Sequence, residues 1–133
     1  FKPIFLKIAP DFQRSGLKIL GATIKKLNIQ GLIATNTTVS RNRLDMSEKE
    51  IQKFGPGGLS GAPLLEDSNA ILAALSIEVG SNIPIIGVGG IFNGIDATEK
   101  LERGASLVQI YSGFVYEGPW IVRNILRDIT YND

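Results

Sequence analysis

The residues with the clearest capacity for chemistry lie at the ends of two apolar segments in the second half of the chain. Residues 84–88 and 106–111 have the composition of buried β-strands. The first runs directly into Gly89 and Gly90, and the second into Ser112. Glycine there lets backbone N–H groups approach a ligand, and the positive end of a following helix favours an anion. Two such strand ends side by side predict a phosphorylated ligand, whereas each glycine pair alone is also typical of an ordinary turn.

A single lysine interrupts the first apolar segment, residues 4–8. Burying the ammonium group of Lys7 is costly unless an anion or an electron-rich group meets it. We therefore expect Lys7 to serve a ligand. The alternative is a lysine that extends its side chain to solvent at the rim of a sheet. Asp11, shortly after this segment, is expected to cap the next helix.

Polar and small residues also follow the second apolar segment. Residues 35–38, Thr-Asn-Thr-Thr, could read a polar heterocycle through paired hydrogen-bond donors and acceptors. A polar turn with Asx or threonine capping is the alternative. Further along, the glycines of residues 57–61 would let the backbone approach a flat ring or a phosphate.

The composition excludes several classes of chemistry. The chain has 133 residues, 44% hydrophobic and 20% charged, as expected of one globular domain. It contains no cysteine and no histidine, so thiol nucleophiles and histidine-based triads are excluded, and we predict no metal site. The net charge of +1 gives no overall field for nucleic acid or an acidic membrane. No apolar run reaches the roughly 18 residues of a membrane span.

Short apolar runs alternate with helical periodicity, which predicts four strand–helix units. Strands are expected at residues 4–8, 31–35, 84–88 and 107–111, and helices at about 17–27, 67–79, 94–103 and from Pro119 onward. The long connection over residues 38–63 contains Ser47 and Glu50 at capping-box spacing. In the last helix the buried stripe is expected to consist of Val122, Ile125, Leu126 and Ile129.

The alternation without hairpin signals indicates a parallel α/β arrangement. Four units suit either half of a (β/α)8 barrel or a small doubly wound sheet. The phosphate site at the third and fourth strand ends favours the barrel. A barrel needs about 200 residues or more, and half a barrel leaves two strand edges unpaired. We therefore expect residues 1–133 to be the second half, incomplete by itself, of a (β/α)8 barrel domain.

These motifs, in this order, resemble the carboxyl-terminal half of dihydroorotate dehydrogenase over essentially the whole chain. They are residues 6–11, residues 35–38 with Arg41, residues 57–64, residues 85–90 and residues 104–112. The Asn-Thr-Thr and Gly-Leu-Ser-Gly-Ala-Pro-Leu forms look like the quinone-dependent class (class 2). The soluble classes carry different residues after the asparagine.

The resemblance implies an FMN-dependent oxidation of dihydroorotate to orotate in pyrimidine biosynthesis, with electrons passed to quinone. It implies that Lys7 meets the flavin near its N1 and C2 carbonyl, where negative charge develops on reduction. The other FMN contacts it implies are Thr35, Gly61, Gly89, Gly90, Tyr111 and Ser112. Asn36 and Thr37 would bind the dihydroorotate ring and carboxylate.

The resemblance also shows what is missing from these residues. The family's catalytic base is a serine from the first half of the barrel, and no motif here matches it, so we assign no catalytic base within this chain. The helices that receive quinone are likewise expected in an amino-terminal part. That part would provide peripheral association with the cytoplasmic face of a bacterial membrane, or with the mitochondrial inner membrane. Residues 42–54 form a longer and more charged loop than the family pattern.

Two other functions compete with this one. The first is another FMN- or phosphate-binding barrel enzyme, such as a dihydrouridine synthase relative or an isomerase. The polar Asn36-Thr37 pair and the lack of a basic surface favour a small pyrimidine acid over a tRNA base. The second is a non-catalytic half-barrel that acts as a binding or assembly module, in which exposed strand edges pair with a second copy.

Overall fold

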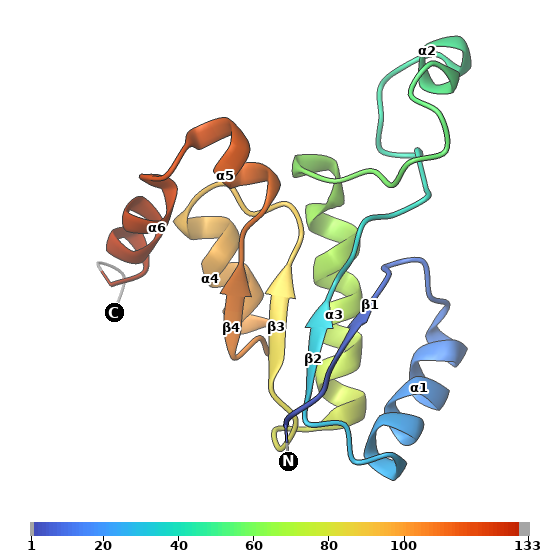
Figure 1. The fold of residues 1–133 in the computed structure, drawn as a ribbon, viewed down its shortest axis with the longest axis vertical. Helices are drawn as coiled ribbons and strands as arrows, with labels where there is room; N and C mark the ends of the chain where they lie inside the picture. The colour runs from blue at the N-terminus through green and yellow to red at the C-terminus, as the bar shows by residue number, and fades with distance from the viewer. Residues whose placement is uncertain (1, 131–133) are drawn as a thin grey trace.

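The computed structural model describes residues 2–130 and contains a four-stranded parallel sheet (Figure 1). The strands are β1 (Phe5–Ile8), β2 (Gly31–Ala34), β3 (Ile85–Val88) and β4 (Leu107–Gln109). Each strand pairs in parallel with the next one along the chain, in the order β1-β2-β3-β4. This sequential order confirms the predicted succession of parallel strand–helix units.

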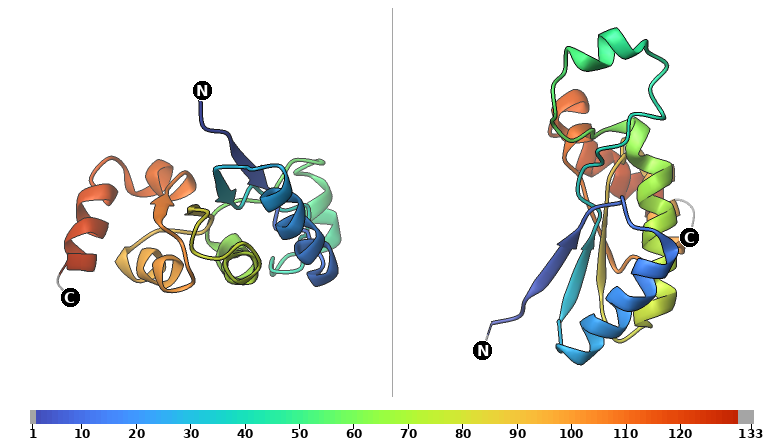
Figure 2. Two further views of the ribbon diagram at one scale, coloured as in Figure 1. Left: turned by 90° about the horizontal axis from the view of Figure 1, so that it is seen from below. Right: turned by 90° about the vertical axis from the view of Figure 1, so that its right-hand side faces the viewer.

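Helices connect the strands, and those that lie along the sheet gather on one face of it (Figure 2). The elements after β1 and β2 are α1 (Arg14–Lys26), α2 (Glu48–Gln52), the 3₁₀ helix η1 (Ala62–Leu64) and α3 (Leu65–Val79). Those after β3 and β4 are α4 (Gly94–Glu102), α5 (Ser112–Glu117) and α6 (Ile121–Thr130). Within residues 2–130, no helix covers the opposite face of the sheet, which corresponds to the interior of a barrel.

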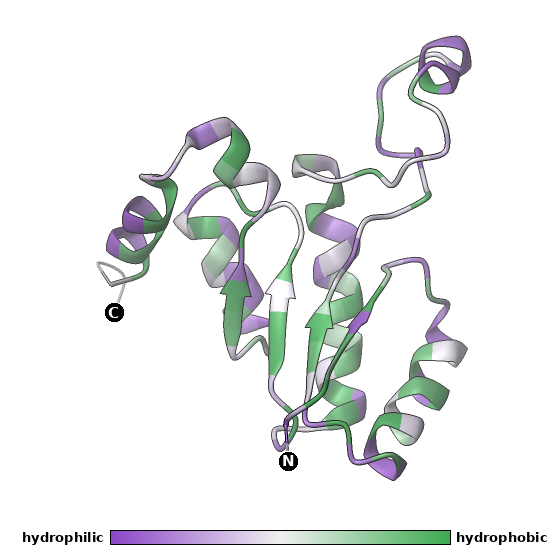
Figure 3. Cartoon of the chain, viewed as in Figure 1, coloured by the Kyte–Doolittle hydropathy of each residue, from purple (hydrophilic) through white to green (hydrophobic). Residues whose placement is uncertain are grey.

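The hydrophobic core lies between the sheet and its helices, and Figure 3 shows the strands as mainly hydrophobic, apart from a hydrophilic stretch in β1 and a neutral end of β3. The larger cluster joins α1 and α3 to β1, β2 and β3, with Leu32, Leu72 and Leu75 fully buried. A smaller cluster joins α4 to α6 through Ala97, Ile121 and Ile125 and includes Ile91. The apolar periodicity of the helices therefore buries the stripe that faces the strands.

The structure corrects several details at the carboxyl-terminal end. β4 ends at Gln109, two residues earlier than predicted, because the chain turns into α5, a short helix that the sequence analysis missed. α6 begins at Ile121 and not at Pro119. Its buried positions are Ile121 and Ile125, whereas Val122 and Leu126 are exposed. Among the described helices α6 packs on α4 and α5, and its buried stripe is narrower than predicted.

The long connection after β2 is held by its own polar contacts. Thr38 and Leu59 form an antiparallel bridge at the base of the loop, with N···O distances of 3.1 and 2.8 Å. Arg41 donates to backbone carbonyls on both sides of the loop, including that of Gly57. Arg43 pairs with Glu66 and Asp67 at the start of α3. These contacts anchor a loop that otherwise extends away from the sheet and carries α2 (Figure 1). The capping box of Ser47 and Glu50 is confirmed.

One lysine lies inside the fold. Lys100 on α4 has no exposed surface, and its stem crosses the backbone of β3 at Gly87, where a side chain on residue 87 would lie 3.2 Å from it. Its ammonium group donates to the hydroxyl of Ser68 on α3. Burial lowers the pKa of Lys100 to about 8. Because burial disfavours the charged form, this lysine costs stability at neutral pH.

The loop after β3 generates a stability prediction. Gly90 has a φ of +78°, and a Cβ there would lie 2.5 Å from the Cα of Leu65. In a complete barrel that carries these residues, Gly90→Ala should therefore lower the free energy of unfolding by about 2–4 kcal/mol, as measured by urea titration. The matched control is Gly57→Ala, where a Cβ meets nothing within 4 Å. Equal midpoints for the two variants would contradict the close packing of this loop on α3.

A second prediction concerns pH. The pKa of Lys100 is about 8 in the folded state and 10.5 as its ordinary value, so the unfolded state binds more protons between those pH values. The free energy of unfolding should therefore rise with pH over that range, relative to Lys100→Met, by up to about 3 kcal/mol. Urea titrations of both proteins at pH 7, 9 and 10.5 test this. A difference that stays constant with pH would mean that Lys100 has an ordinary pKa.

Candidate ligand-binding site

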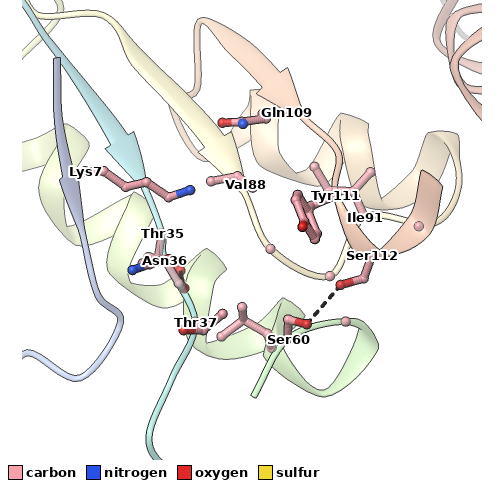
Figure 4. A pocket seen from close by; sticks show the side chains of 15 residues that line it. Lys7, Thr35, Asn36, Thr37, Ser60, Val88, Ile91, Gln109, Tyr111 and Ser112 are labelled. Carbon is pink, nitrogen blue, oxygen red and sulfur yellow. Dashed lines mark hydrogen bonds between the residues drawn. The ribbon is translucent and has the colours of Figure 1, made fainter. Parts of the chain in front are cut away.

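A cavity of about 280 Å³ lies at the carboxyl ends of the strands (Figure 4). Residues of β1, β3 and β4 and the segment directly after β2 contribute to its wall, together with the segment that leads into α3. Every residue that the sequence analysis assigned to FMN or substrate lines this cavity: Lys7, Thr35, Asn36, Thr37, Gly61, Gly89, Gly90, Tyr111 and Ser112. The structure therefore brings the predicted residues together from five separate segments, while their individual roles stay predictions.

Lys7 reaches the cavity because of the alternation of side chains along β1. Its neighbour Ile8 points to the helix-covered face and is buried in the main core. Lys7 therefore points to the opposite face, and Figure 4 shows its amino group directed across the end of β2 toward Val88. Among the described residues Lys7 has no hydrogen bond or ion pair, so an unpaired cation lines the cavity.

The end of β2 is fixed on both sides by backbone hydrogen bonds. The N–H of Thr35 donates to the carbonyl of Val88 at 2.8 Å, and the N–H of Asn36 donates to the carbonyl of Ile8 at 2.6 Å. Thr35 is buried, and its hydroxyl donates to the carbonyl of Asn36 at 2.9 Å. Within residues 2–130, the side chains of Asn36 and Thr37 form no hydrogen bond and remain available at the cavity. The backbone thus positions polar side chains that can bind a ligand.

Glycines form another part of the cavity wall. Gly61, Gly89 and Gly90 all have φ values between +78° and +116°, which L-residues with a side chain rarely adopt. In the described part of the chain, the N–H groups of Gly89, Gly90 and Ile91 donate to no protein acceptor. Amides that line a cavity without a protein acceptor can donate to a ligand, so these three are candidate donors to an acceptor such as a phosphate oxygen.

Two hydroxyl groups meet at the same wall. Ser112 Oγ donates to Ser60 Oγ at 3.0 Å, which joins the start of α5 to the segment before α3 (dashed line in Figure 4). Each hydroxyl retains further hydrogen-bonding capacity for a ligand. Tyr111 stands next to Ser112 and is 76% exposed, so its ring presents a surface that these residues alone do not cover.

The sequence analysis gave no role to some residues of the cavity wall. They are Ser60, Leu64, Val88, Ile91, Gln109 and Gly113. Gln109 could have been identified from its pattern, because it is a polar residue in a β-strand and lies beside Val88 in the sheet register. The apolar residues carry no such signal in sequence, since buried core residues have the same composition.

Asp11 has a different role from the predicted one. α1 has no side-chain cap, and Asp11 does not cap it. Its Oδ1 instead accepts from the hydroxyl of Thr38 at 2.6 Å and from the N–H of Val39 at 3.2 Å. Asp11 therefore ties the segment after β1 to the segment after β2, just beyond the cavity residues.

Residues 2–130 contain neither a candidate metal centre nor a candidate membrane-spanning helix. No group of three or more carboxylate, histidine or cysteine side chains there could hold a metal ion. None of the helices in this part of the chain has the length and hydrophobicity that a membrane span requires.

Comparison with known proteins agrees with this geometry. The family model of dihydroorotate dehydrogenase matches residues 1–132. The dihydroorotate dehydrogenase (quinone) of Burkholderia thailandensis is 48% identical over 127 residues, which cover 96% of this chain and 36% of that protein. The corresponding protein of Psychromonas ingrahamii is 48% identical over 129 residues, covering 97% and 38%. The chain therefore spans about a third of the length of these relatives.

Solved structures give the same result. Ligand-free DHODH from Eimeria tenella matches with a TM-score of 0.85 and 34% identity over 94% of this chain and 34% of that one. DHODH from the same organism in complex with ferulenol matches with a TM-score of 0.86 and 32% identity, over 96% and 33%. The four strand–helix units are thus part of a (β/α)8 barrel, as predicted. With its family model matched from end to end and its fold shared with solved members, the chain belongs to the dihydroorotate dehydrogenase family.

Proposed function

We propose that the cavity holds FMN and dihydroorotate, and that the chain serves the oxidation of dihydroorotate to orotate in pyrimidine biosynthesis, with quinone as electron acceptor. The observation that carries the proposal is the convergence of Lys7, the amides of Gly89 and Gly90, and Asn36 on one cavity. FMN and dihydroorotate together require a cation near the flavin ring, donors for the phosphate group and a side-chain amide that can hydrogen-bond the substrate.

The cavity wall has the donor set that FMN needs. The unpaired amides of Gly89, Gly90 and Ile91 would bind phosphate oxygens, together with the hydroxyl of Ser112. These groups lie on one wall, and Lys7 reaches the cavity from the strand at the far edge of the sheet. Thr35 and Gly61 would line the ring between them. The donor set therefore separates a phosphate end from a ring end.

When bound, FMN would supply the acceptor for the hydride that leaves one carbon of the substrate's C–C single bond, while a proton leaves the other carbon and its electron pair forms the double bond. Lys7 would then face the negative charge that gathers on the ring, and a fixed cation stabilises that charge without reorganisation. Asn36 and Thr37 would orient the substrate through hydrogen bonds to its ring and carboxylate. The chain provides no catalytic base in this proposal, so proton removal falls to a residue outside it.

The proposal assigns the remaining functions to the part of the relatives that this chain does not span. That part would supply the other half of the barrel wall, the base and the quinone entrance. Its contact with quinone would place the protein at a membrane surface, either the bacterial cell membrane or the mitochondrial inner membrane. Tyr111, which is 76% exposed here, stands at the surface where such a part would pack.

A chimera provides the protein for the tests. Residues 1–133 replace the matching segment of the Burkholderia thailandensis dihydroorotate dehydrogenase (quinone), to which they are 48% identical. The chimera should bind FMN and oxidise dihydroorotate. A well-folded chimera that does neither would contradict the proposed function.

In the chimera, Lys7→Ala should weaken FMN binding or slow flavin reduction by one to several orders of magnitude, because the loss of the cation removes about 2–4 kcal/mol of electrostatic stabilisation. Stopped-flow absorbance measures the reduction rate, and Lys18→Ala on the exposed side of α1 is the control. Full flavin content together with an unchanged reduction rate would rule out the role assigned to Lys7.

In the chimera, Asn36→Ala should impair the binding or turnover of dihydroorotate and leave the binding of FMN unchanged. Removing one partner of a buried hydrogen bond costs about 1–3 kcal/mol, so the KM for dihydroorotate should rise or kcat should fall at normal flavin content. Steady-state kinetics and the flavin-to-protein ratio test this, with Asn82→Ala in the exposed turn before β3 as the control. Loss of FMN with unchanged substrate kinetics would reverse the assignment.

Residues 1–133 by themselves should be inactive with dihydroorotate, hold FMN weakly and associate or aggregate. The helix-free face of the sheet exposes apolar side chains, with Phe5 41% and Leu107 63% exposed, and such a surface favours association. Light scattering, flavin absorbance and a dihydroorotate assay provide the measurements. Dihydroorotate oxidation by a folded monomer would require a base that we do not find in the chain.

A further inference from the structure

The buried ammonium group of Lys100 has no role in the function described so far. Within residues 2–130 it forms no ion pair, and its one hydrogen-bond partner is the hydroxyl of Ser68. The charged side chains that act on it are Asp96 and Glu99 on its own helix and Arg103 at the C-cap of that helix. A buried cation without a carboxylate partner is costly, and a core position on α4 could be filled by an apolar residue at less cost. The ammonium group therefore calls for a functional explanation.

Ser68 connects this lysine to the cavity wall. Its Oγ lies 3.1 Å from the carbonyl oxygen of Gly89 and 2.9 Å from that of Leu65. A hydroxyl group has one hydrogen to donate and lone pairs to accept with. Because Lys100 donates to Ser68, the serine is held with its hydrogen directed to these carbonyls. The loop also rests on Ser68, since a Cβ on Gly89 would lie 3.0 Å from it.

The carbonyl of Gly89 and the N–H of Gly90 belong to one planar trans peptide unit, in which they point in opposite directions. A hydrogen bond from Ser68 to that carbonyl therefore turns the N–H of Gly90 away from α3. That N–H is the middle one of the three amides that lack a protein acceptor, and Gly90 lines the cavity. The contact with Ser68 thus sets the direction of a donor at the site.

We propose that Lys100 is a positioning residue for phosphate binding, which acts through Ser68 to hold the Gly89–Gly90 peptide with its N–H toward the phosphate group of the cofactor. The inference rests on the proposed function, because it deepens the assignment of the cavity to FMN. The side chain of Lys100 does not line the cavity, so its effect is transmitted by the serine and the peptide unit.

The test compares FMN with riboflavin, which lacks the phosphate group, in fluorescence titrations of the flavin-free chimera at pH 6.5. Lys100→Met keeps the length of the side chain and removes the charge. It should raise the Kd for FMN roughly tenfold, as for a lost charge-assisted hydrogen bond, and change the Kd for riboflavin by less than about twofold. Lys26→Met removes an exposed lysine from α1 and should change neither Kd.

Ser68→Ala distinguishes two ways in which Lys100 could affect FMN binding. The effect could pass through Ser68, or the charge of Lys100 could attract the phosphate group directly over a longer distance. Ser68→Ala should produce the same FMN-selective loss as Lys100→Met, and the double variant should lose no more than either single variant, because both belong to one chain of contacts. If Lys100→Met does not fold, Ser68→Ala carries the test by the same criterion.

Several outcomes would overturn the inference. The first is an unchanged affinity of Lys100→Met for FMN. The second is an equal loss of affinity of Lys100→Met for FMN and for riboflavin, as expected of a merely structural residue. The third is normal FMN binding by Ser68→Ala while Lys100→Met loses affinity for FMN. If the chimera without further substitutions binds FMN no more tightly than riboflavin, the proposed phosphate site itself is overturned. Failure of the inference is therefore distinguishable from failure of the proposed function.

Discussion

The parallel pairing of four consecutive strands is the constraint on which the cavity depends. It brings the carboxyl ends of all four strands to one edge of the sheet. The backbone hydrogen bonds between strands continue just beyond the end of β2, where the N–H groups of Thr35 and Asn36 donate to β3 and β1. Backbone hydrogen bonds therefore set where Lys7, Asn36 and Gly90 stand relative to one another. The side chains at this edge can therefore set which ligand binds without being needed for folding. Such a separation of binding residues from core residues is general in barrels of this kind.

Much of this arrangement could be predicted from sequence, because the signals were local. An isolated lysine in an apolar strand and glycines directly after strands depend on neighbouring residues alone, and strand alternation then directs Lys7 to the cavity. The role of Asp11 was predicted wrongly because its partners, Thr38 and Val39, are 27 and 28 residues away. α5 was missed because its apolar residues are exposed and give no buried stripe. The contacts of Arg41 and Arg43 likewise depend on how the long loop folds back.

The groups that cost stability in this fold gather around the cavity. Within residues 2–130, the amides of Gly89 and Gly90 donate to no protein acceptor and Lys100 is a buried cation without an ion pair. Lys7 is exposed and unpaired, so it costs little by itself and can meet a ligand in the cavity. Local rules of folding are usually violated at functional sites, where a ligand supplies the missing contacts. The agreement between these costs and a ligand with a phosphate end and an electron-accepting ring is the main physical support for FMN.

The central claim is that one cavity at the strand ends holds FMN with its phosphate on the glycine wall. A crystal structure of the chimera grown with FMN tests this most directly. We expect the phosphate oxygens to lie about 3 Å from the amide nitrogens of Gly90 and Ile91 and from the hydroxyl of Ser112, with the flavin ring beside Lys7. A phosphate bound away from these amides, or a flavin outside the cavity, would contradict the claim.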